Sequence, residues 1–475
     1  MLSIIQKLKK ETNNNKFIIY RKKNLFLKKI YIIYNETITS SNSISNYIIR
    51  SLNNIFIPTY RNIINKISNF KYQEINTIRD INYYLNNGFT IIIYSKDKYI
   101  ALETKKDLTR SITSPITENT ARGALDSFTE NIETNIGLIK RRIKSNDLWA
   151  KNYSIGKYTS TNISLLYISS IAKEELVNRI DKLIKNIDID GIIAAGTIRN
   201  LIAKENKINF PNIISTEKPY TTSKYLLQGN IVILTDNDPF ALIMPATLND
   251  YFISEEDDFG KSINVSLTRI IRYITFAITL LTPGIYIAIT TYNQEIIPTE
   301  LLISIATQRE DVPFSTFVEA LLMTLSFEIL RESDLKIPSF ASSALSIVGA
   351  LILGEAAVSA GIVSPIMIIV IAITSISSLT FNEPEFINAM KLYRLAFMIG
   401  GALLGMYGIL LVFIFMIINL SSYDFMDTPY LVPFSPPIKA NLKDSIIKFP
   451  TKKLTKRNHI LTNNINKKKA DDIND

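Results

Sequence analysis

A single carboxylate, Glu355, lies inside an otherwise apolar stretch of the sequence. The segment 341–381, which contains SIVGALILGEAAVSAGIVSP, consists almost entirely of small and apolar residues. A carboxylate within a membrane-spanning helix is costly and by default marks a functional site such as an ion pathway. We therefore take Glu355 as the first candidate functional residue.

Helical spacing predicts that Glu355 lies on a face bounded by two flanks of small residues. Small side chains let membrane helices approach closely, so a helix with two such flanks suits a ring of identical copies. In a ring, Glu355 attracts cations, and apolar neighbours on its face form a constriction that gates by dewetting. The predicted pore-lining residues are Leu351, Glu355, Val358, Ser359 and Ile362, and the predicted packing residues between copies are Ser346, Gly349, Ala350, Gly354, Ala357 and Gly361.

A second interpretation of Glu355 needs no pore. In a monomeric bundle the carboxylate only accepts hydrogen bonds from Ser or Thr side chains, or pairs with Arg331 or Arg394. The sequence leaves both interpretations open.

Four apolar segments are long enough to carry this helix and its neighbours across a membrane. About 20 helical residues at about 1.5 Å each cross a hydrocarbon core of about 30 Å. The candidate spans are 267–292, 342–361, 365–381 and 395–420. Four spans keep both basic chain ends on the cytoplasmic side, as the positive-inside tendency prefers, whereas a fifth span at 314–330 would export the basic tail.

The segment 298–331 lies between the first two spans and is predicted to form interfacial helices. It is apolar on one face and charged on the other, which is typical of helices that lie at a membrane surface. Its charged residues are candidates for coupling the cytoplasmic region to the spans: Glu300, Arg309, Glu319, Glu328 and Arg331.

The N-terminal half predicts a cytoplasmic α/β domain with two small subdomains. Residues 1–60 are basic and rich in Asn, Ser, Lys and Ile, and we expect them to be weakly structured. The first α/β subdomain is expected at 61–147, with a hairpin at 89–103 and a helix from Leu125 to Ile143. The second is expected at 148–265, with strands at 163–168, at 190–196 and in a hairpin at 231–247, and a helix at 172–187; alternating strands and helices suggest a partly parallel sheet. The predicted fold class is therefore an α/β N-terminal domain followed by an α-helical multi-span membrane domain at 266–422 and a basic cytoplasmic tail at 423–475.

Composition argues against most enzyme classes. The chain of 475 residues has no cysteine and one histidine, His459, so disulfides, zinc sites built on Cys or Cys/His, and thiol nucleophiles are excluded, and a Ser-His-Asp triad lacks its usual base. No P-loop, G-x-S-x-G or H-E-x-x-H motif is present. Asp188 and Asp190 are better explained as polar residues beside a short strand than as an acid/base pair. We expect no enzyme and no cofactor.

The chain ends carry the positive charge, and their expected partner is lipid. Lys and Arg outnumber Asp and Glu in both 1–50 and 439–475, beside a long apolar block. Neither end interleaves aromatic residues with base-reading motifs, so we expect no nucleic acid partner. Basic ends of this kind favour the anionic surface of a membrane.

Several segments in order resemble the A subunit of the GerA-type spore germinant receptors of endospore-forming bacteria. The longest is IIPTELLISIATQREDVPFSTFVEALLMTLSFEILRE at 296–332, followed by the Glu355 segment and TPYLVPFSP at 428–436. Upstream, FTENIETNIGLIKRRI, IDIDGI, STEKP and DNDPFALIMPAT resemble the family in the same order. The resemblance runs from Arg122 to Pro437 and does not reach the first 60 residues.

The resemblance implies a location and partners. It implies the spore inner membrane, a multi-pass topology with both termini cytoplasmic, and a complex with a B-type transporter-like subunit and a C-type lipoprotein. It also implies a homo-oligomeric, nutrient-gated ion channel that triggers germination by cation release, with the B-type subunit as the germinant binder. Position 355 is often Gln in such proteins, so a polar group can suffice there.

One departure keeps two alternatives open. The segment Arg122–Phe128, RGALDSF, differs from the usual family pattern and partly resembles the stage V sporulation paralogue of the A subunit, which is implicated in ion and dipicolinate release. The 298–332 motif favours the receptor subunit. A membrane-anchored nutrient-binding sensor without a pore is the other alternative.

Overall fold

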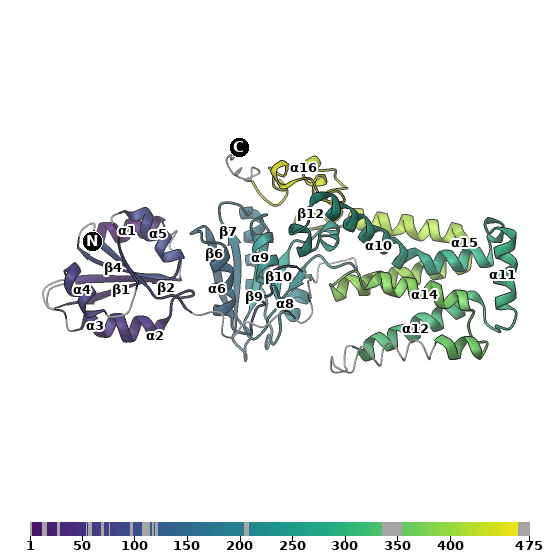
Figure 1. Cartoon of the computed structure of the whole chain (residues 1–475), viewed down its shortest axis with the longest axis horizontal. Helices are drawn as coiled ribbons and strands as arrows, with labels where there is room; N and C mark the ends of the chain where they lie inside the picture. The colour runs from purple at the N-terminus through teal and green to yellow at the C-terminus, as the bar shows by residue number, and fades with distance from the viewer. Residues whose placement is uncertain are drawn as a thin grey trace.

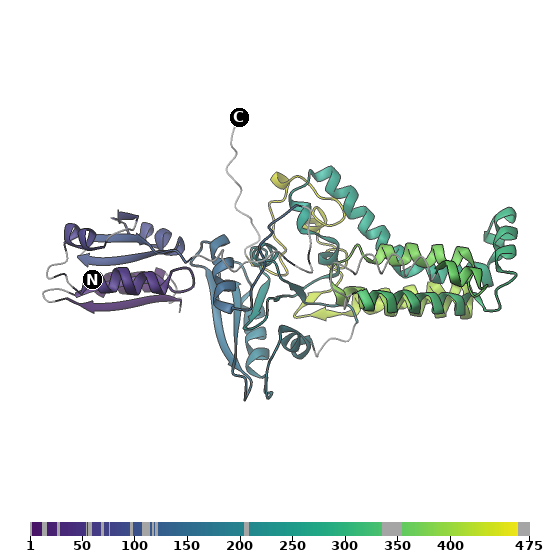
Figure 2. The same cartoon turned by 60° about the horizontal axis from the view of Figure 1, so that its bottom comes forward.

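Two α/β units and a helical bundle follow one another along the long axis of the chain, which is described by a computed structural model (Figures 1 and 2). The structure describes residues 2–11, 17–25, 29–53, 55, 59–67, 71–75, 77–95, 98–106, 115, 118, 122–203, 209–334 and 354–463. The predicted fold class, an α/β N-terminal region followed by a helical region, is confirmed.

The first unit is a five-stranded antiparallel sheet covered by helices on both faces. Its order is β1-β2-β4-β5-β3. The strands are β1 (Ile18–Asn24), β2 (Lys29–Asn35), β3 (Tyr72–Ile75), β4 (Phe89–Ser95) and β5 (Lys98–Glu103). One face packs on α1 (Leu2–Glu11) and α5 (Ile78–Asn86), and the other on η1 (Ile44–Ile49), α3 (Arg50–Leu52) and α4 (Tyr60–Lys66), with α2 (Ser41–Ser43) leading into η1.

The expectation that residues 1–60 are weakly structured is wrong. β1 and β2 pair along their whole lengths, and β2 pairs with β4. In β2, Ile30 and Ile32 contribute to one core of the first unit and Ile33 to the other. Strand alternation was therefore present in the sequence but was obscured by the Asn- and Lys-rich composition around it.

The second unit repeats this architecture with a second antiparallel sheet. Its order is β6-β7-β9-β10-β8. The strands are β6 (Leu148–Ile155), β7 (Thr161–Ile168), β8 (Ile214–Thr216), β9 (Ile231–Thr235) and β10 (Ala241–Met244). The helices α6 (Ile132–Arg142) and α9 (Pro219–Leu226) cover one face, and α7 (Glu174–Lys185) and α8 (Ala195–Ile202) cover the other.

Three expectations for the α/β region are corrected. Every strand pair in the described residues is antiparallel, so the predicted parallel component is wrong. The helix predicted from Leu125 begins at Ile132, where the Asn131 side chain accepts a hydrogen bond from Thr134 and caps it; it packs on the second sheet rather than the first. Residues 190–194 form no strand and lead into α8.

The helical bundle begins at α10 (Ser262–Thr291). α11 (Thr299–Arg309) lies across the far end of the bundle, and α12 (Thr316–Asp334) runs back along it (Figure 1). The described helical residues 354–359, called here the Glu355 helix, are followed by α14 (Pro365–Ser378) and α15 (Pro384–Ser422). α12 packs on α10 and α14 through Ala320 and Met323, and the interfacial location of 298–331 stays a prediction.

α15 is a helical hairpin and not one continuous helix. At Gly405 the backbone has φ 60° and ψ −141°, outside the helical region. The Asn419 Nδ2 atom donates a hydrogen bond to the Tyr393 hydroxyl at 2.9 Å. In a straight helix 26 residues span about 39 Å, so this bond requires the chain to reverse. The single predicted span at 395–420 is therefore wrong, because two antiparallel helices meet at Gly405.

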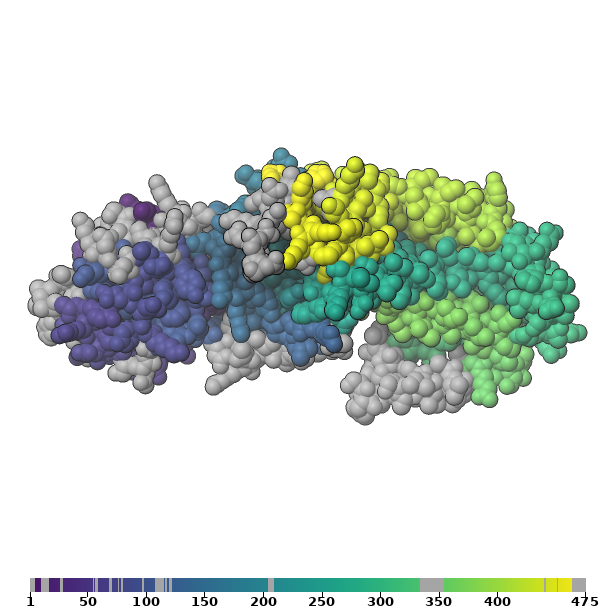
Figure 3. Space-filling view, turned by 45° about the horizontal axis from the view of Figure 1, so that its top comes forward, coloured from purple at the N-terminus to yellow at the C-terminus, as the bar shows by residue number. Residues whose placement is uncertain are grey.

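The C-terminal segment is a packed part of the fold. Residues 423–463 include β11 (Asp424–Phe425), β12 (Thr428–Pro429), α16 (Lys439–Leu442) and η6 (Thr451–Lys453), and they cover the junction between the second unit and α10 (Figure 3). Tyr430 and Leu461 are buried, and Thr462 forms a β-bridge with Ala172. The segment predicted as a basic cytoplasmic tail is therefore packed against the fold over residues 423–463, and its cytoplasmic location stays a prediction.

Candidate functional site

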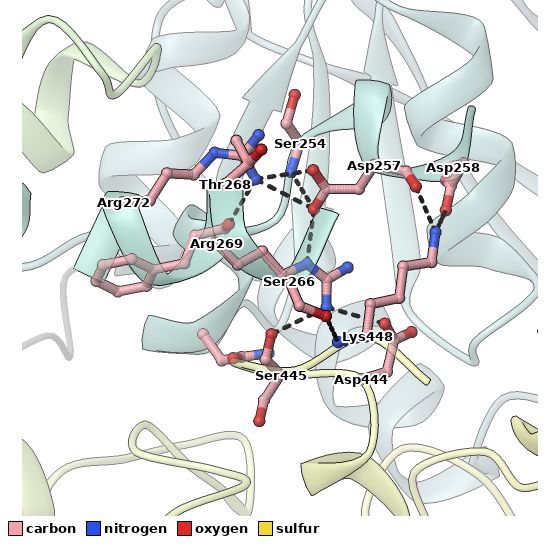
Figure 4. Close-up of polar contacts among 12 residues, drawn as sticks. Ser254, Asp257, Asp258, Ser266, Thr268, Arg269, Arg272, Asp444, Ser445 and Lys448 are labelled. Carbon is pink, nitrogen blue, oxygen red and sulfur yellow. Dashed lines mark hydrogen bonds and ion pairs between the residues drawn. The ribbon is translucent and has the colours of Figure 1, made fainter. Parts of the chain in front are cut away.

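A buried ion-pair network joins the second α/β unit to the start of α10 (Figure 4). Asp257 in η4 (Glu255–Asp258) accepts hydrogen bonds from Arg269 Nε at 2.7 Å and from Arg272 Nη1 at 2.9 and 3.1 Å. Arg269 also donates to Asp444 at 2.9 Å and to the Ser445 carbonyl at 2.9 Å. The network therefore connects η4, α10 and the C-terminal segment.

Local structure fixes each member of this network. Arg269 and Arg272 are three residues apart in α10 and so lie on one helix face. Asp257 also closes a capping box with Ser254, which holds the short η4 helix in place. Lys448 from the C-terminal segment donates to Asp258 at 3.2 Å.

The burial of these charges makes the network costly to disrupt. The side chains of Asp257 and Arg269 are 2% and 1% exposed. Removing one partner of a buried pair leaves an uncompensated charge and costs about 3–5 kcal/mol. The first turns of α10 are therefore held in a fixed position against the second unit.

Aromatic stacking extends the same contact to α15. Phe252 stacks on Tyr273 of α10 with ring centroids 4.0 Å apart. Tyr251 stacks on Phe386 of α15 at 4.7 Å, and Phe210 on Tyr393 at 5.3 Å. Each such pair adds about 0.5–1.5 kcal/mol beyond the area that it buries. The second unit and the first turns of both long helices thus form one packed body.

A cleft of about 650 Å³ lies beside this contact, between the second unit, α10 and the loop before α15. Arg199 in its wall pairs with Glu383 at 3.7 Å and with Glu385. Burial raises the pKa of the Glu383 carboxyl to about 8, against the opposing effect of Arg199, and raises that of Glu118 to about 7. The cleft can therefore hold or release protons near neutral pH. Within the residues described, no group of three or more acidic or His side chains is placed to hold a metal ion.

Two predicted coupling residues meet at the opposite end of the bundle. Arg309 at the end of α11 pairs with Glu319 of α12 at 3.2 Å. The other Glu319 carboxylate oxygen accepts hydrogen bonds from the backbone N–H and the hydroxyl of Ser364, at 3.1 and 3.0 Å. Ser364 is the N-cap residue of α14. This chain of contacts links α11 to the loop that follows the Glu355 helix, whereas Glu300 is exposed in the first turn of α11.

The other two predicted coupling residues pair with each other. Glu328 and Arg331 form an ion pair at 3.4 Å, and Glu328 also accepts a hydrogen bond from Lys391 of α15. Arg331 thus pairs with Glu328, and Glu355 is exposed, so the structure does not support a Glu355–Arg331 pair.

The residues predicted to line a pore are partly exposed and partly packed inside the bundle. Glu355 and Ser359 are exposed, but Val358 and Ala357 pack against the chain's own bundle, beside the cluster that contains Ile287 and Met367. The helix ends before Ile362, so helical spacing does not place that residue on the face of Glu355; Ile362 is exposed, and its pore-lining role stays a prediction.

The predicted packing residues also have neighbours within the chain. Gly361 adopts φ +65°, and a Cβ atom there would lie 3.3 Å from the Asp311 carbonyl oxygen, so its glycine is explained by a turn. A Cβ atom on Gly354 would meet Ile368 at 3.8 Å. The remaining predicted site residues lie outside the described residues: Leu351, Ser346, Gly349 and Ala350.

Sequence reasoning missed the ion-pair network and the hairpin at Gly405. Arg269 and Arg272 stand three residues apart at the start of an apolar helix, and paired charges on one face of such a helix were the available signal. The hairpin also had a signal, because the glycines at 400, 401, 405 and 408 interrupt the apolar run. No sequence pattern pointed to Asp257 as the shared partner.

The sequence of this chain matches a known protein family. Residues 6–460 match the family described as Bacillus/Clostridium GerA spore germination protein. The chain belongs to the GerA family. The family resemblance inferred from the sequence is therefore confirmed, and the family is described by spore germination, not by a catalytic activity.

Spore germination proteins of Bacillus subtilis (strain 168) are among the curated relatives of the GerA-family chain. Spore germination protein KA is 41% identical over 356 residues, covering 74% of this chain and 65% of that protein. Spore germination protein B1 is 33% identical over 437 residues, covering 90% of each chain. Spore germination protein A1 is 32% identical over 442 residues, covering 93% of this chain and 91% of that protein.

A solved structure is also similar to the GerA-family chain. It is the N-terminal domain of the A subunit of the Bacillus megaterium spore germinant receptor GerK3, with a TM-score of 0.38 and 27% identity, covering 51% of this chain and 94% of that one.

Proposed function

We propose that this GerA-family chain is the A subunit of a spore germinant receptor and that its copies assemble into a nutrient-gated cation channel that triggers germination. The relatives named as spore germination proteins support the role in germination. The observation that carries the channel proposal is the Glu355 helix, whose Glu355 and Ser359 side chains are exposed although the opposite face packs on the bundle. An exposed carboxylate on an apolar bundle suits a water-filled path between copies.

The proposed location is the spore inner membrane. Among the described residues, α10 and the whole of α15 are long and apolar enough to cross a membrane, although α15 reverses at Gly405 and so enters and leaves on one side. The start of α10, the start of α15 and the C-terminal segment gather at the end of the bundle beside the second unit, and α11 and Gly405 lie at the other end (Figure 1). With both basic chain regions on the side of the α/β units, this arrangement fits cytoplasmic termini. The proposed partners are a B-type transporter-like subunit, a C-type lipoprotein and further copies of this chain.

Ion conductance of the receptor complex in liposomes tests the channel. Glu355→Leu should reduce cation conductance severalfold, because the polar group that keeps the path hydrated is lost. Val358→Ala is the matched control, since Val358 packs against its own bundle and should leave conductance unchanged. Unchanged conductance in Glu355→Leu, or a complex that holds one copy of this chain, would contradict the proposal.

A nutrient-binding sensor without a pore is the second candidate, and the cleft beside α10 favours it. Arg199 and Glu385 lie in its wall and offer both charges to a small zwitterionic solute. Because Lys218 and Glu255 pair at 2.9 Å and are almost fully buried, a bound solute would compete mainly for Arg199. Calorimetry with the full chain decides this: germinant binding that Arg199→Gln abolishes, in liposomes that show no conductance, would favour the sensor.

A further inference from the structure

Four charged side chains meet between α12 and the first half of α15. Glu328 of α12 accepts a hydrogen bond from Lys391 and pairs with Arg331 at 3.4 Å. Arg394 lies within electrostatic reach of Glu328 and Arg331. Three cations around one carboxylate leave a net positive charge at this place, which is called here the Glu328 cluster.

Arg394 is the unusual member of the Glu328 cluster. The residue is 7% exposed, and none of the residues that the structure describes gives its guanidinium a hydrogen bond or an ion pair. Glu328 is already engaged by Lys391 and Arg331. A buried cation without a bonded partner is costly, so the arrangement lacks an anion.

The Glu328 cluster lies at mid-depth of the bundle. Arg394 is midway between Pro384, where α15 begins, and Gly405, where it reverses, which places it about 15 Å from either end. A hydrocarbon core is about 30 Å thick. Exposed aliphatic side chains continue on both sides of the cluster: Ile376, Leu379 and Leu392 toward the second unit, and Leu321, Leu325 and Leu403 toward the far end. If the bundle spans a membrane, the cluster therefore lies at the centre of the apolar layer.

The Glu328 cluster is partly exposed on the outside of the bundle. The side chains of Glu328, Arg331 and Lys391 are 34%, 27% and 23% exposed. Ionised groups that face hydrocarbon are costly, and charged side chains within membrane segments face other protein segments or water instead. An apolar surface with a positive centre is complementary to a membrane helix that carries a carboxylate.

Two candidate sources within this chain do not supply the missing carboxylate. The stretch 335–353, which joins α12 to the Glu355 helix, contains no Asp or Glu. The Glu355 helix meets Ile368, about one turn from Ser364, whereas Glu328 lies about two and a half turns along α12 from the same level. Rotation about the membrane normal keeps each residue at its own depth, so a further copy in a ring would hold Glu355 about 7 Å from the level of the cluster.

We propose that a transmembrane helix of a different subunit lies against α12 and the first half of α15 and places an Asp or Glu carboxylate on Arg394. The planar guanidinium presents parallel N–H donors that match the two oxygens of a carboxylate, and Lys391 adds a second positive charge beside it. The aliphatic side chains on both sides of the cluster pack against the same helix. The inference rests on the membrane location proposed above and not on ring formation or conductance.

Photo-cross-linking in membranes that hold this chain together with its two proposed partner subunits tests the contact. A benzoylphenylalanine at Leu395, which is exposed one residue beyond Arg394, should form a covalent link to a subunit other than this chain. Mass spectrometry should map the link to a membrane helix that contains Asp or Glu. Arg394→Gln should lower the yield of the link severalfold, because a bidentate charge-assisted contact is lost.

Matched variants separate the contact from general charge and from misfolding. The same probe at Phe415, exposed at about the same depth in the second half of α15, should give a yield that does not respond to Arg394→Gln. Arg141→Gln removes an exposed positive charge from α6 and should leave the yield from Leu395 unchanged. If Arg394→Gln does not fold, Lys391→Gln, at a half-buried position, should still lower the yield severalfold.

Each opposing result has a definite meaning. Links from Leu395 only to lipid, or only to another copy of this chain, overturn the contact with a different subunit. A mapped helix without Asp or Glu, or a yield that both Arg394→Gln and Lys391→Gln leave intact, overturns the ion pair. Release of the wild type from membranes by alkaline extraction overturns the membrane location itself, which is a different outcome from an inserted protein that gives no link to a partner.

Discussion

The α10–α15 pair and the Glu355 helix both use small residues, but for different contacts. A Cβ atom added to Gly401 of α15 would lie 2.5 Å from the Gly284 carbonyl oxygen of α10, so these two helices touch through their backbones. In the Glu355 helix, Ala356 and Ser359 are exposed, and so is Ala360 directly after it. Small residues thus mark both a closed contact within the chain and an open face, and only the open face is available to another copy.

This difference identifies α10 and α15 as the rigid part of the bundle, called here the scaffold. α10 and α15 are fixed at one end by the Asp257 network and by aromatic stacking. The Glu355 helix is attached through Val358 and, past its end, through the bonds from Ser364 to Glu319. The described residues of this helix are held on one face by a rigid pair, which suits the other face to line an interface between copies.

Removing the shared carboxylate should give the largest effect. Asp257→Asn leaves Arg269 and Arg272 without their buried anion, and the free energy of unfolding should fall by about 3–5 kcal/mol. Thermal or denaturant unfolding of the purified chain measures this loss. Asp444→Asn is the control: its side chain is 38% exposed and should cost at most about 1 kcal/mol. Equal losses in the two variants would show that the scaffold is not anchored at Asp257.

A methyl group at the hairpin contact should have the next largest effect. In Gly408→Ala the new Cβ atom meets the backbone of Gly400, so the two halves of α15 must separate. Overpacking of this kind costs about 1–3 kcal/mol, which unfolding measurements detect.

The matched control lies in the second unit. At Gly196 in α8 a Cβ atom meets nothing within 4 Å, so Gly196→Ala should be neutral or stabilising by up to about 1 kcal/mol. A Gly408→Ala variant as stable as the wild type would contradict the close hairpin.

The cleft beside the scaffold should make stability depend on pH. The pKa of the Glu383 carboxyl is about 4.3 in the unfolded chain and about 8 in the folded chain. At pH values between these two, Glu383 is protonated in the folded chain and ionised in the unfolded chain. Stability should therefore fall as pH rises from about 5 through about 8, because the unfolded chain releases this proton and the folded chain holds it. The midpoint of thermal unfolding should follow this decline, and Glu383→Gln should flatten it.

The pH control uses a carboxyl in an open environment. Glu175 is exposed in α7, so Glu175→Gln should keep the slope of the wild type. A slope that rises with pH, or one that Glu383→Gln leaves intact, would show that Glu383 is ionised in the folded chain.

The smallest effect on stability is expected at the open face. Glu355 is exposed, so Glu355→Gln should change the free energy of unfolding by less than about 0.5 kcal/mol. Unfolding in detergent measures this. A loss as large as that of Gly408→Ala would mean that Glu355 stabilises its own bundle, which is the interpretation without a pore.

The sequence predicted local elements better than their partners. The hairpin of β4 and β5 and helix α7 followed from alternation and helical spacing, which are local patterns. The antiparallel second sheet did not follow, because β8 and β10 pair across a long connection that local patterns do not specify. Likewise, Arg309 and Glu319 could be named as candidates, but their meeting with Ser364 depends on how α11, α12 and α14 pack.

The helical wheel of the Glu355 helix shows the same limit. It placed Val358 beside Glu355 but could not say which face meets the rest of the chain. Val358 turned out to pack inward and Ser359 to be exposed. Periodicity gives the angles around a helix axis, whereas tertiary contacts decide which angle is buried.

Cross-linking through single cysteines tests most directly whether copies meet at the Glu355 helix. The chain has no cysteine of its own, so each introduced thiol is unique. Assembled complex carrying Ser359→Cys should give covalently linked copies with a short bis-maleimide, whereas Val358→Cys, which faces its own bundle, should not. Labelling of both variants after unfolding confirms that each thiol is present. Absence of linked copies in Ser359→Cys, or equal linkage in both variants, would contradict the proposal that copies of the chain assemble around this face.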